Sequence, residues 1–85
     1  MGYAVEFAPS AEREFRKLAR NVQVRLRPRI DSLADTPRPP GAKKLAGARD
    51  LWRIRVGDYR IVYQVRDEIL LVLVLGAAHR REVYR

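Results

Sequence analysis

The sequence contains no cysteine and only one histidine, His79. Without cysteine the chain can form no disulfide, no thiolate nucleophile and no cysteine-ligated zinc site, which suits a reducing cytosol. A lone histidine and the lack of an Asp/Glu cluster at metal-ligand spacing also disfavour a catalytic metal. We therefore expect a protein that needs no cofactor and no metal ion.

Long apolar segments and catalytic hydroxyls are scarce as well. The most apolar run, residues 69–75, is far shorter than the roughly 20 residues of a membrane-spanning helix, and no signal peptide precedes the first predicted strand. We therefore expect a cytoplasmic protein that does not use a membrane. Ser10 is expected to cap a helix and Ser32 to lie in one, so a Ser-His-Asp triad is disfavoured. Gly-rich phosphate loops and helix-turn-helix signals are also missing.

Acidic residues are few compared with basic ones. Fifteen Arg and three Lys face ten Asp and Glu in a chain of 85 residues, which gives a net charge of +8. A positive charge this large on a small protein indicates an anionic partner. Nucleic acid, an acidic protein or an anionic membrane surface would each suit. The preference for Arg favours bidentate recognition of phosphate or carboxylate, although a GC-rich coding bias enriches Arg too. The length predicts one domain, residues 1–85, with a modest core.

Residues 51–63 are predicted to form a β-hairpin around which the chain is organised, with Gly57-Asp58 as the turn. The predicted facing pairs are Val56 with Tyr59, Arg55 with Arg60, Ile54 with Ile61, Arg53 with Val62, and Trp52 with Tyr63. Since side chains alternate between the faces of a strand, one face collects the apolar members and the other collects Arg53, Arg55 and Arg60 around Val62. The first is expected to be a core face and the second a cationic one.

The cationic face has an energetic cost. Arg55 opposite Arg60 places like charges together, which destabilises a sheet by ~0.2–1 kcal/mol. A merely solvated basic face would tolerate this cost, but three arginines on one rigid hairpin also suit the backbone of a nucleic acid, and we favour that interpretation.

The N-terminal half alternates strand and helix signals. Residues 3–7 read as a strand, and Ser10 is a natural N-cap for an amphipathic helix. Asn21 is expected near the corner between this helix and a second one that continues to Asp35. Pro28 interrupts that second helix, so either the helix kinks there or its well-formed part begins near Arg27.

The C-terminal half contains the remaining strands. Residues 36–49 are predicted to be a long connection anchored by Leu45, with Lys43 and Lys44 extending the basic surface toward the hairpin. Residues 69–75 are apolar on both faces and predict a central strand covered on both sides. A charge-rich tail, residues 76–85, follows.

The predicted fold is therefore α+β: an N-terminal strand, a two-helix hairpin and a three-stranded antiparallel meander. The helices pack on one face of a mainly antiparallel, four-stranded sheet in which the hairpin and residues 69–75 are contiguous. The strand order is left open.

Among nucleic-acid chemistries, RNA cleavage needs neither a metal nor a protein nucleophile, because the substrate's 2′-hydroxyl can attack the adjacent phosphate. The protein then supplies positioning, charge neutralisation and proton transfer. The cations available to neutralise the phosphate are Arg53, Arg55, Arg60, Arg80 and Arg81. The available proton carriers are His79 and Tyr84. Alternatively, His79 is an ordinary surface histidine and Tyr84 a packing residue.

Four segments resemble one known family. They are Tyr3-x-Val-x-Phe7, Lys43-Lys44-Leu45-x-Gly47, the block from Arg55 to Tyr63, and His79-Arg-Arg-Glu-Val-Tyr84. Together they resemble the RelE/ParE superfamily of type II toxins, in particular its RelE branch, over essentially the whole chain. The resemblance implies a metal-independent endoribonuclease, an mRNA interferase, that cuts mRNA in the ribosomal A site and so inhibits translation. It also implies a cognate antitoxin, in a hetero-oligomeric complex that binds operator DNA through the antitoxin.

The resemblance also implies roles for individual residues. Arg60 matches the family's central phosphate-binding arginine and Tyr84 its C-terminal catalytic tyrosine. Arg53 and Arg55 fall where well-studied members carry a pair of lysines, one of them proposed as the general base. With arginine there, either His79 is the base, or activity is weak, or catalysis rests on orienting the 2′-hydroxyl.

The expected RNA-binding residues are Arg80, Arg81, Lys43, Lys44, Arg53 and Arg55. Two alternatives to the nuclease stay open. One is a ParE-like poison of DNA gyrase, against which Tyr84 and the basic hairpin argue. The other is a non-catalytic homologue that binds an antitoxin and modulates repression of their operon. By resemblance, the antitoxin is expected to dock on exposed apolar positions of the helical hairpin as a disordered segment that folds on binding.

Overall fold

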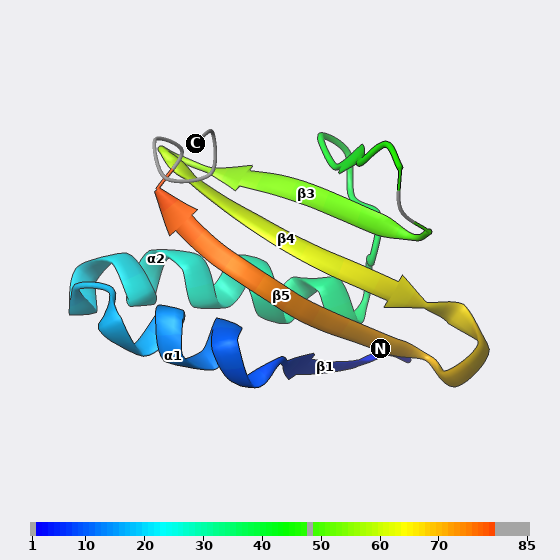
Figure 1. The fold of residues 1–85 in the computed structure, drawn as a ribbon, viewed down its shortest axis with the longest axis horizontal. Coiled ribbons are helices and arrows are strands. Elements are labelled where there is room, and N and C mark those ends of the chain that lie inside the picture. Colours follow the sequence, from blue (N-terminus) through cyan, green and yellow to red (C-terminus); the bar gives the residue numbers. More distant parts are fainter. Residues whose placement is uncertain (1, 48, 80–85) are drawn as a thin grey trace.

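A computed structural model describes residues 2–47 and 49–79 and, over these residues, has two layers, a five-stranded sheet and two helices (Figure 1). The elements in chain order are β1 (Ala4–Phe7), α1 (Pro9–Lys17), α2 (Arg20–Asp31), β2 (Lys43–Lys44), β3 (Leu51–Val56), β4 (Tyr59–Arg66) and β5 (Leu71–His79). Short 3₁₀ helices lie at Ser32–Ala34 and Asp67–Ile69. The predicted α+β class is confirmed.

The sheet has the order β1-β5-β4-β3-β2. β1 runs parallel to β5, with Ala4 beside Leu71 and Phe7 beside Val74, while the other neighbours are antiparallel. The predicted contiguity of the hairpin and the last strand is confirmed, and so is the mainly antiparallel character. β1 is therefore an edge strand, and β5 lies between β1 and β4.

The predicted register of the hairpin is confirmed at all five facing pairs, from Trp52 with Tyr63 to Val56 with Tyr59. Gly57 has φ +60° in the turn, a conformation that a side chain would strain. A Cβ at Gly57 would also meet the guanidinium of Arg25, which reaches the turn from α2. The guanidinium is the end of a flexible side chain and can move aside, so the turn needs glycine for its backbone conformation.

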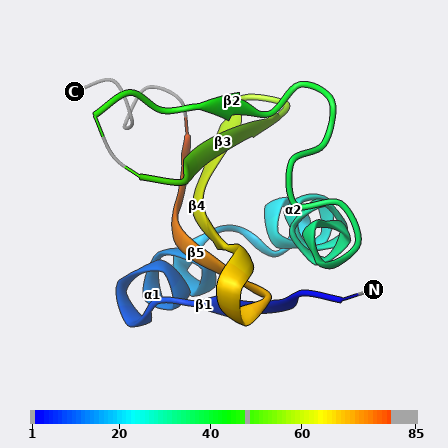
Figure 2. The same cartoon turned by 90° about the vertical axis from the view of Figure 1, so that its right-hand side faces the viewer.

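The core lies between the helices and one face of the sheet. Its buried members are Ala11, Phe15, Val22, Leu26, Ile30, Leu33, Ile54, Val56, Ile61, Tyr63, Val65, Val72, Val74 and Ala77. On β3 and β4 these residues alternate with polar and basic ones, as a sheet covered on one face requires. Figure 2 shows the chain leaving α2 and crossing to β2, at the far edge of the sheet.

The helix boundaries differ from the prediction. Ala8, not Ser10, is the N-cap of α1, and Pro9 occupies the first helical position, where its missing N–H costs nothing. The corner lies at Leu18 and Ala19, two to three residues before Asn21. α2 begins at Arg20 and continues through the exposed Pro28, so a start near Arg27 is wrong.

The last strand also differs from the prediction. β5 begins at Leu71 rather than Ile69, because Ile69 and Leu70 form an exposed turn in which Leu70 has φ +52°. β5 is central, and the helices cover one of its faces; on the other face, Leu71 and Leu73 are only half-buried, and no described helix covers them. The expectation of cover on both sides is therefore wrong.

The connection over residues 36–49 contains a strand that was not predicted. Lys43 pairs with Arg53 and Lys44 with Trp52, so β2 adds a fifth strand to the expected four. The Leu45 N–H donates to the Leu51 carbonyl at 2.8 Å, which closes the end of this short ladder. Over the described part of the chain, no helix has the length and apolar character to cross a bilayer.

Candidate nucleic-acid interface

The sheet face turned away from the helices carries a group of basic side chains near the hairpin turn. Lys43 lies beside Arg53, and Arg55 lies beside Arg60. Residues that face each other across strands point to the same side, and side chains alternate along each strand, so these four share one face. We call Lys43, Arg53, Arg55 and Arg60 the cationic face.

Arg60 lies at the centre of the cationic face. It is on β4, between Arg55 on β3 and Ala78 on β5, and only 2% of its surface is exposed. A guanidinium keeps its proton in proteins, and moving a charge out of water costs several kcal/mol before its partners repay the cost. A buried cation beside a second arginine on an otherwise open face is typical of a binding site rather than of a solvated surface.

The other cations of this face differ from Arg60 in exposure. Lys43 and Arg55 are exposed, and Arg53 is half-buried. Between residues 2 and 79, with residue 48 left aside, no ion pair involves Lys43, Arg53 or Arg55. Among the described residues, no carboxylate therefore neutralises their charge.

The rest of the open face is mostly neutral. Val62, Gln64, Leu71 and Leu73 continue it toward the other end of β4 and β5, and all four are half-buried. This apolar half was not predicted, because the second face of residues 69–75 was expected to be covered. The sequence did contain a signal for it: residues 69–75 are apolar at every position, so a sheet covered on one face leaves every second residue of this run on the open face.

His79 lies on the opposite side of the sheet from the cationic face. It faces Tyr59, whose neighbours on the same side, Val56 and Ile61, are buried in the core. The rings of Tyr59 and His79 meet edge to face, with centroids 5.3 Å apart and an interplanar angle of 83°. The structure therefore does not bring His79 together with Arg60.

A β-bulge explains the side on which His79 lies. The register of β4 and β5 shifts between Val62 and Tyr63, so that both Val74 and Ala77 point into the core. Strict alternation from Val74 would have placed residue 79 on the open face, and the extra residue reverses that assignment.

Three predicted site residues, Arg80, Arg81 and Tyr84, lie outside the described residues, so their roles stay predictions. Lys44 pairs with Trp52 and therefore points to the side opposite Lys43. It is exposed but does not belong to the cationic face. Within the described residues, no cluster of three acidic or histidine side chains could hold a metal ion.

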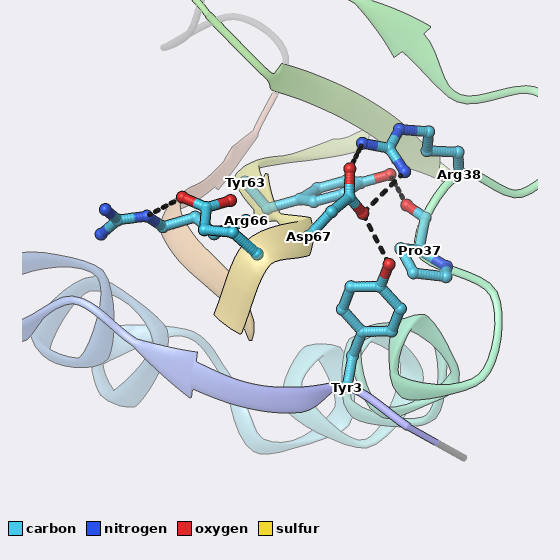
Figure 3. Close-up of polar contacts among 7 residues, drawn as sticks. Tyr3, Pro37, Arg38, Tyr63, Arg66 and Asp67 are labelled. Carbon is cyan, nitrogen blue, oxygen red and sulfur yellow. Dashed lines mark hydrogen bonds and ion pairs between the residues drawn. The ribbon is translucent and has the colours of Figure 1, made fainter. Parts of the chain in front are cut away.

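A second polar cluster lies at the other end of the sheet (Figure 3). The carboxylate of Asp67 accepts hydrogen bonds from both terminal nitrogens of Arg38, at 3.2 and 2.8 Å, and from the Tyr3 hydroxyl at 2.5 Å. The Arg38 guanidinium also lies 5.4 Å from the centre of the Trp52 ring. We call Tyr3, Arg38, Trp52 and Asp67 the clasp, because they join segments that are far apart in sequence.

The clasp perturbs its titratable groups. Hydrogen bonds from Arg38 and then from Tyr3 lower the pKa of Asp67, while the bond to Asp67 raises the pKa of Tyr3. Beside the clasp, the buried Tyr63 donates to the Pro37 carbonyl at 2.7 Å, and burial raises the pKa of this tyrosine to about 12. These shifts keep Asp67 ionised and both tyrosines protonated at neutral pH, the forms in which their hydrogen bonds hold the segments together.

The helix layer carries a separate groove of about 330 Å³. Its lining residues are Phe7, Glu12, Phe15, Arg16, Gln23 and Arg27. The rings of Phe7 and Phe15 are 5.5 Å apart, and Arg27 lies 5.5 Å from the centre of the Phe7 ring. The groove therefore combines an aromatic floor with basic side chains, and the exposed Val24 lies beside a neighbouring hollow that shares Phe15 and Arg27.

Comparison with known proteins gives one family. Residues 5–84 match the model of a family described as the ParE toxin of type II toxin–antitoxin systems. The chain is 38% identical to the mRNA interferase toxin RelE of Escherichia coli K12, over 99% of this chain and 92% of that protein. It is 32% identical to toxin RelG of Mycobacterium tuberculosis, over 100% of this chain and 99% of that protein.

Solved structures give the same relationship. The isolated E. coli RelE toxin superposes with a TM-score of 0.81 at 35% identity, covering 96% of this chain and 90% of the other. A chain of the intact E. coli RelBE toxin–antitoxin complex also superposes with a TM-score of 0.81, at 33% identity, covering 91% of this chain and 95% of the other.

Proposed function

The chain belongs to the ParE toxin family of type II toxin–antitoxin systems, and we propose that it acts there as a RelE-type, metal-independent endoribonuclease that cuts mRNA in the ribosomal A site. The observation that carries this proposal is the cationic face, in which a buried arginine is flanked by basic side chains that form no ion pair within the described residues. The E. coli relative named an mRNA interferase supplies the substrate class.

In the proposed reaction, the 2′-hydroxyl of one nucleotide attacks the adjacent phosphate, and the 5′-oxygen of the next nucleotide leaves. Negative charge builds up on the pentacoordinate phosphate. Arg60 stabilises this charge from the centre of the sheet, and Arg55 and Arg53 hold the flanking backbone. Positioning and charge neutralisation supply most of the rate enhancement, because no metal or protein nucleophile takes part.

Proton transfer must come from elsewhere. The cationic face offers only arginine and lysine, and arginine stays protonated at neutral pH. We assign the proton transfer, or the orientation of the 2′-hydroxyl, to Tyr84 in the tail, with Arg80 and Arg81 as further RNA contacts. His79 is on the wrong side of the sheet for direct contact with a phosphate bound at Arg60.

The proposed partner is a cognate antitoxin, as in the solved RelBE complex to which this chain is similar. The groove floored by Phe7 and Phe15 fits an apolar segment, and Arg16 and Arg27 at its rim are already paired with Glu12 and Asp31. That the antitoxin docks on exposed apolar positions of the helical hairpin stays a prediction from the resemblance. A purified protein that stays soluble, monodisperse and harmless to cells without any partner would contradict the need for an antitoxin.

Single-turnover cleavage of mRNA on programmed ribosomes tests the proposed reaction, with free RNA as the control substrate. Tyr84→Phe keeps the ring and deletes the hydroxyl, so it should bind ribosomes normally and lose cleavage by ~10²-fold or more. Arg60→Ala removes a charged substrate contact and should lower both ribosome binding and cleavage. Arg13→Ala is the matched control, because it removes an exposed arginine from α1 in the helix layer.

Circular dichroism must first show that each variant is folded, since Arg60 is buried. Unchanged cleavage in both folded variants, Arg60→Ala and Tyr84→Phe, would mean that the active site lies elsewhere. Toxicity with broken DNA and intact mRNA would favour a gyrase poison instead. A harmless protein that binds its antitoxin and modulates operator binding would favour the non-catalytic alternative.

A further inference from the structure

We propose that His79 is a positioning residue for this cleavage: through the ring of Tyr59 it fixes the end of the β4–β5 ladder that holds Arg60. This role presupposes the endoribonuclease activity proposed above. It also gives His79 a part in the reaction without requiring that its imidazole touch the substrate.

The cross-strand register places this ring pair next to Arg60. Tyr59 faces His79, and the adjacent pair is Arg60 with Ala78. Tyr59 packs against the core, so its ring is held from the helix side. The imidazole of His79 meets that ring edge to face, a favoured geometry for two aromatic rings. The last pair of the ladder is thus tied to the core.

The end of β5 needs such an anchor because its other edge has little support. β1 accompanies β5 only from Leu71 to Val74, and within the described residues no strand pairs with that edge from residue 75 onward. On that side, a long hydrogen bond of 3.5 Å joins the Ala77 N–H to the Glu14 carboxylate. Fraying of the Tyr59–His79 pair would therefore loosen Ala78 and, with it, the strand that carries Arg60.

Small displacements of Arg60 matter for the reaction. A misplacement of about 1 Å can lower a rate by up to ~10²-fold, because charge stabilisation depends on fixed geometry. Residues 80–85, which include Tyr84, follow His79 directly in sequence, so the position of His79 also fixes where that segment starts. A ring at position 79 can provide this anchor whether or not it carries a titratable nitrogen.

Substitutions at position 79 separate positioning from proton transfer. His79→Phe keeps a ring and removes both nitrogens, whereas His79→Gln keeps a polar group and removes the ring. We expect His79→Phe to cleave within roughly threefold of wild type at saturating ribosomes. His79→Gln and His79→Ala should lose about tenfold in the single-turnover rate, with little change in ribosome affinity.

A second measurement follows the ladder itself. Amide hydrogen exchange at Arg60 and Ala78 should accelerate in His79→Ala and His79→Gln but not in His79→Phe. Tyr59→Leu should resemble His79→Ala, and the double variant should lose no more than either single variant, because both remove the same contact.

Three outcomes would overturn the proposal. Losses of ~10²-fold or more in both His79→Phe and His79→Gln would make His79 a general base. Full activity in His79→Ala would leave it without a role, as would unchanged amide exchange in that variant. A wild type that cleaves no mRNA would overturn the proposed function instead, and the exchange data would then decide the contribution of His79 to the ladder by themselves.

Discussion

Arginine serves different purposes at the two ends of the sheet. At the clasp, Arg38 is held by the carboxylate of Asp67 and by the ring of Trp52. At the cationic face, Arg55 lies opposite another arginine, and no carboxylate among the described residues neutralises it. Arg38 and Arg55 have the same side chain, and they differ only in the residues around them.

Under the proposed function, this difference separates a stabilising arginine from one that binds an anion. A partnered arginine satisfies its own charge and fixes the backbone around it, so its removal should cost stability. An arginine opposite a like charge costs stability while it is present, so its removal should relieve repulsion and weaken binding of an anion. Net charge alone does not distinguish the two.

The largest expected effect concerns RNA binding by the cationic face. Arg53→Gln combined with Arg55→Gln should weaken binding of single-stranded RNA about tenfold or more and reduce the slope of log affinity against log salt by ~0.7 for each phosphate that the protein no longer neutralises. Filter binding or fluorescence anisotropy at several salt concentrations would measure both. Arg13→Gln combined with Arg29→Gln removes the same charge from the helices, and an equal weakening there would contradict a localised site.

The next effect concerns the hydrogen bond beside the clasp. Tyr63→Phe deletes the hydroxyl that donates to the Pro37 carbonyl and should lower the free energy of unfolding by about 1 kcal/mol. Urea denaturation would measure this change. Cleavage should be unchanged, because Tyr63 lies on the core face. A loss of cleavage without a loss of stability would place part of the active site at this end of the sheet.

A smaller and opposite pair of effects follows from removing one arginine at each end. Arg38→Ala should destabilise the protein by about 0.5–1 kcal/mol, largely through its contact with Trp52. Arg55→Gln should leave stability unchanged or raise it by up to ~1 kcal/mol, because Arg60 then faces a neutral side chain. Thermal unfolding at one ionic strength compares them. Equal destabilisation in both variants would remove the distinction between the two ends.

The smallest effect depends on pH. The clasp lowers the pKa of Asp67 below its ordinary value of 3.8, so its stabilisation is fully present above that value and is lost as the pH falls through the folded-state pKa. Asp67→Asn should therefore lower the melting temperature at pH 6 and make little difference near pH 2. A melting-temperature difference that persists unchanged at pH 2 would mean that the carboxylate charge is not what holds the clasp.

Local patterns predicted the hairpin well. Alternation of apolar and basic residues around Gly57-Asp58 gave the correct pairs, because the two-residue turn sets the register and a slip of one residue would put Ile54 and Ile61 on opposite faces. The helix starts were predicted less well. Ser10 has the better capping side chain, but Pro9 already fits the first helical turn, and the helix begins there.

The side of the sheet on which His79 lies could not be predicted in the same way. It depends on the bulge in β5, which lets both Val74 and Ala77 reach the core. A bulge of this kind depends on the partner strand and on the packing of α1 against β5, and neither is encoded in the local alternation. The depth of Arg60 could not be predicted from the alternation either, since Val62 and Gln64 on the same face of β4 are only half-buried.

The sequence by itself determined the class of the fold, the hairpin register, the excess of basic charge and the identity of the arginines that share one face. These follow from local periodicity and composition, which act between residues close in the chain. Only the tertiary structure decided the parallel pairing of β1 with β5, the burial of Arg60, the separation of His79 from the cationic face and the partnership of Arg38 with Asp67. All four depend on segments that are far apart in sequence, and therefore on how complete helices and strands pack together.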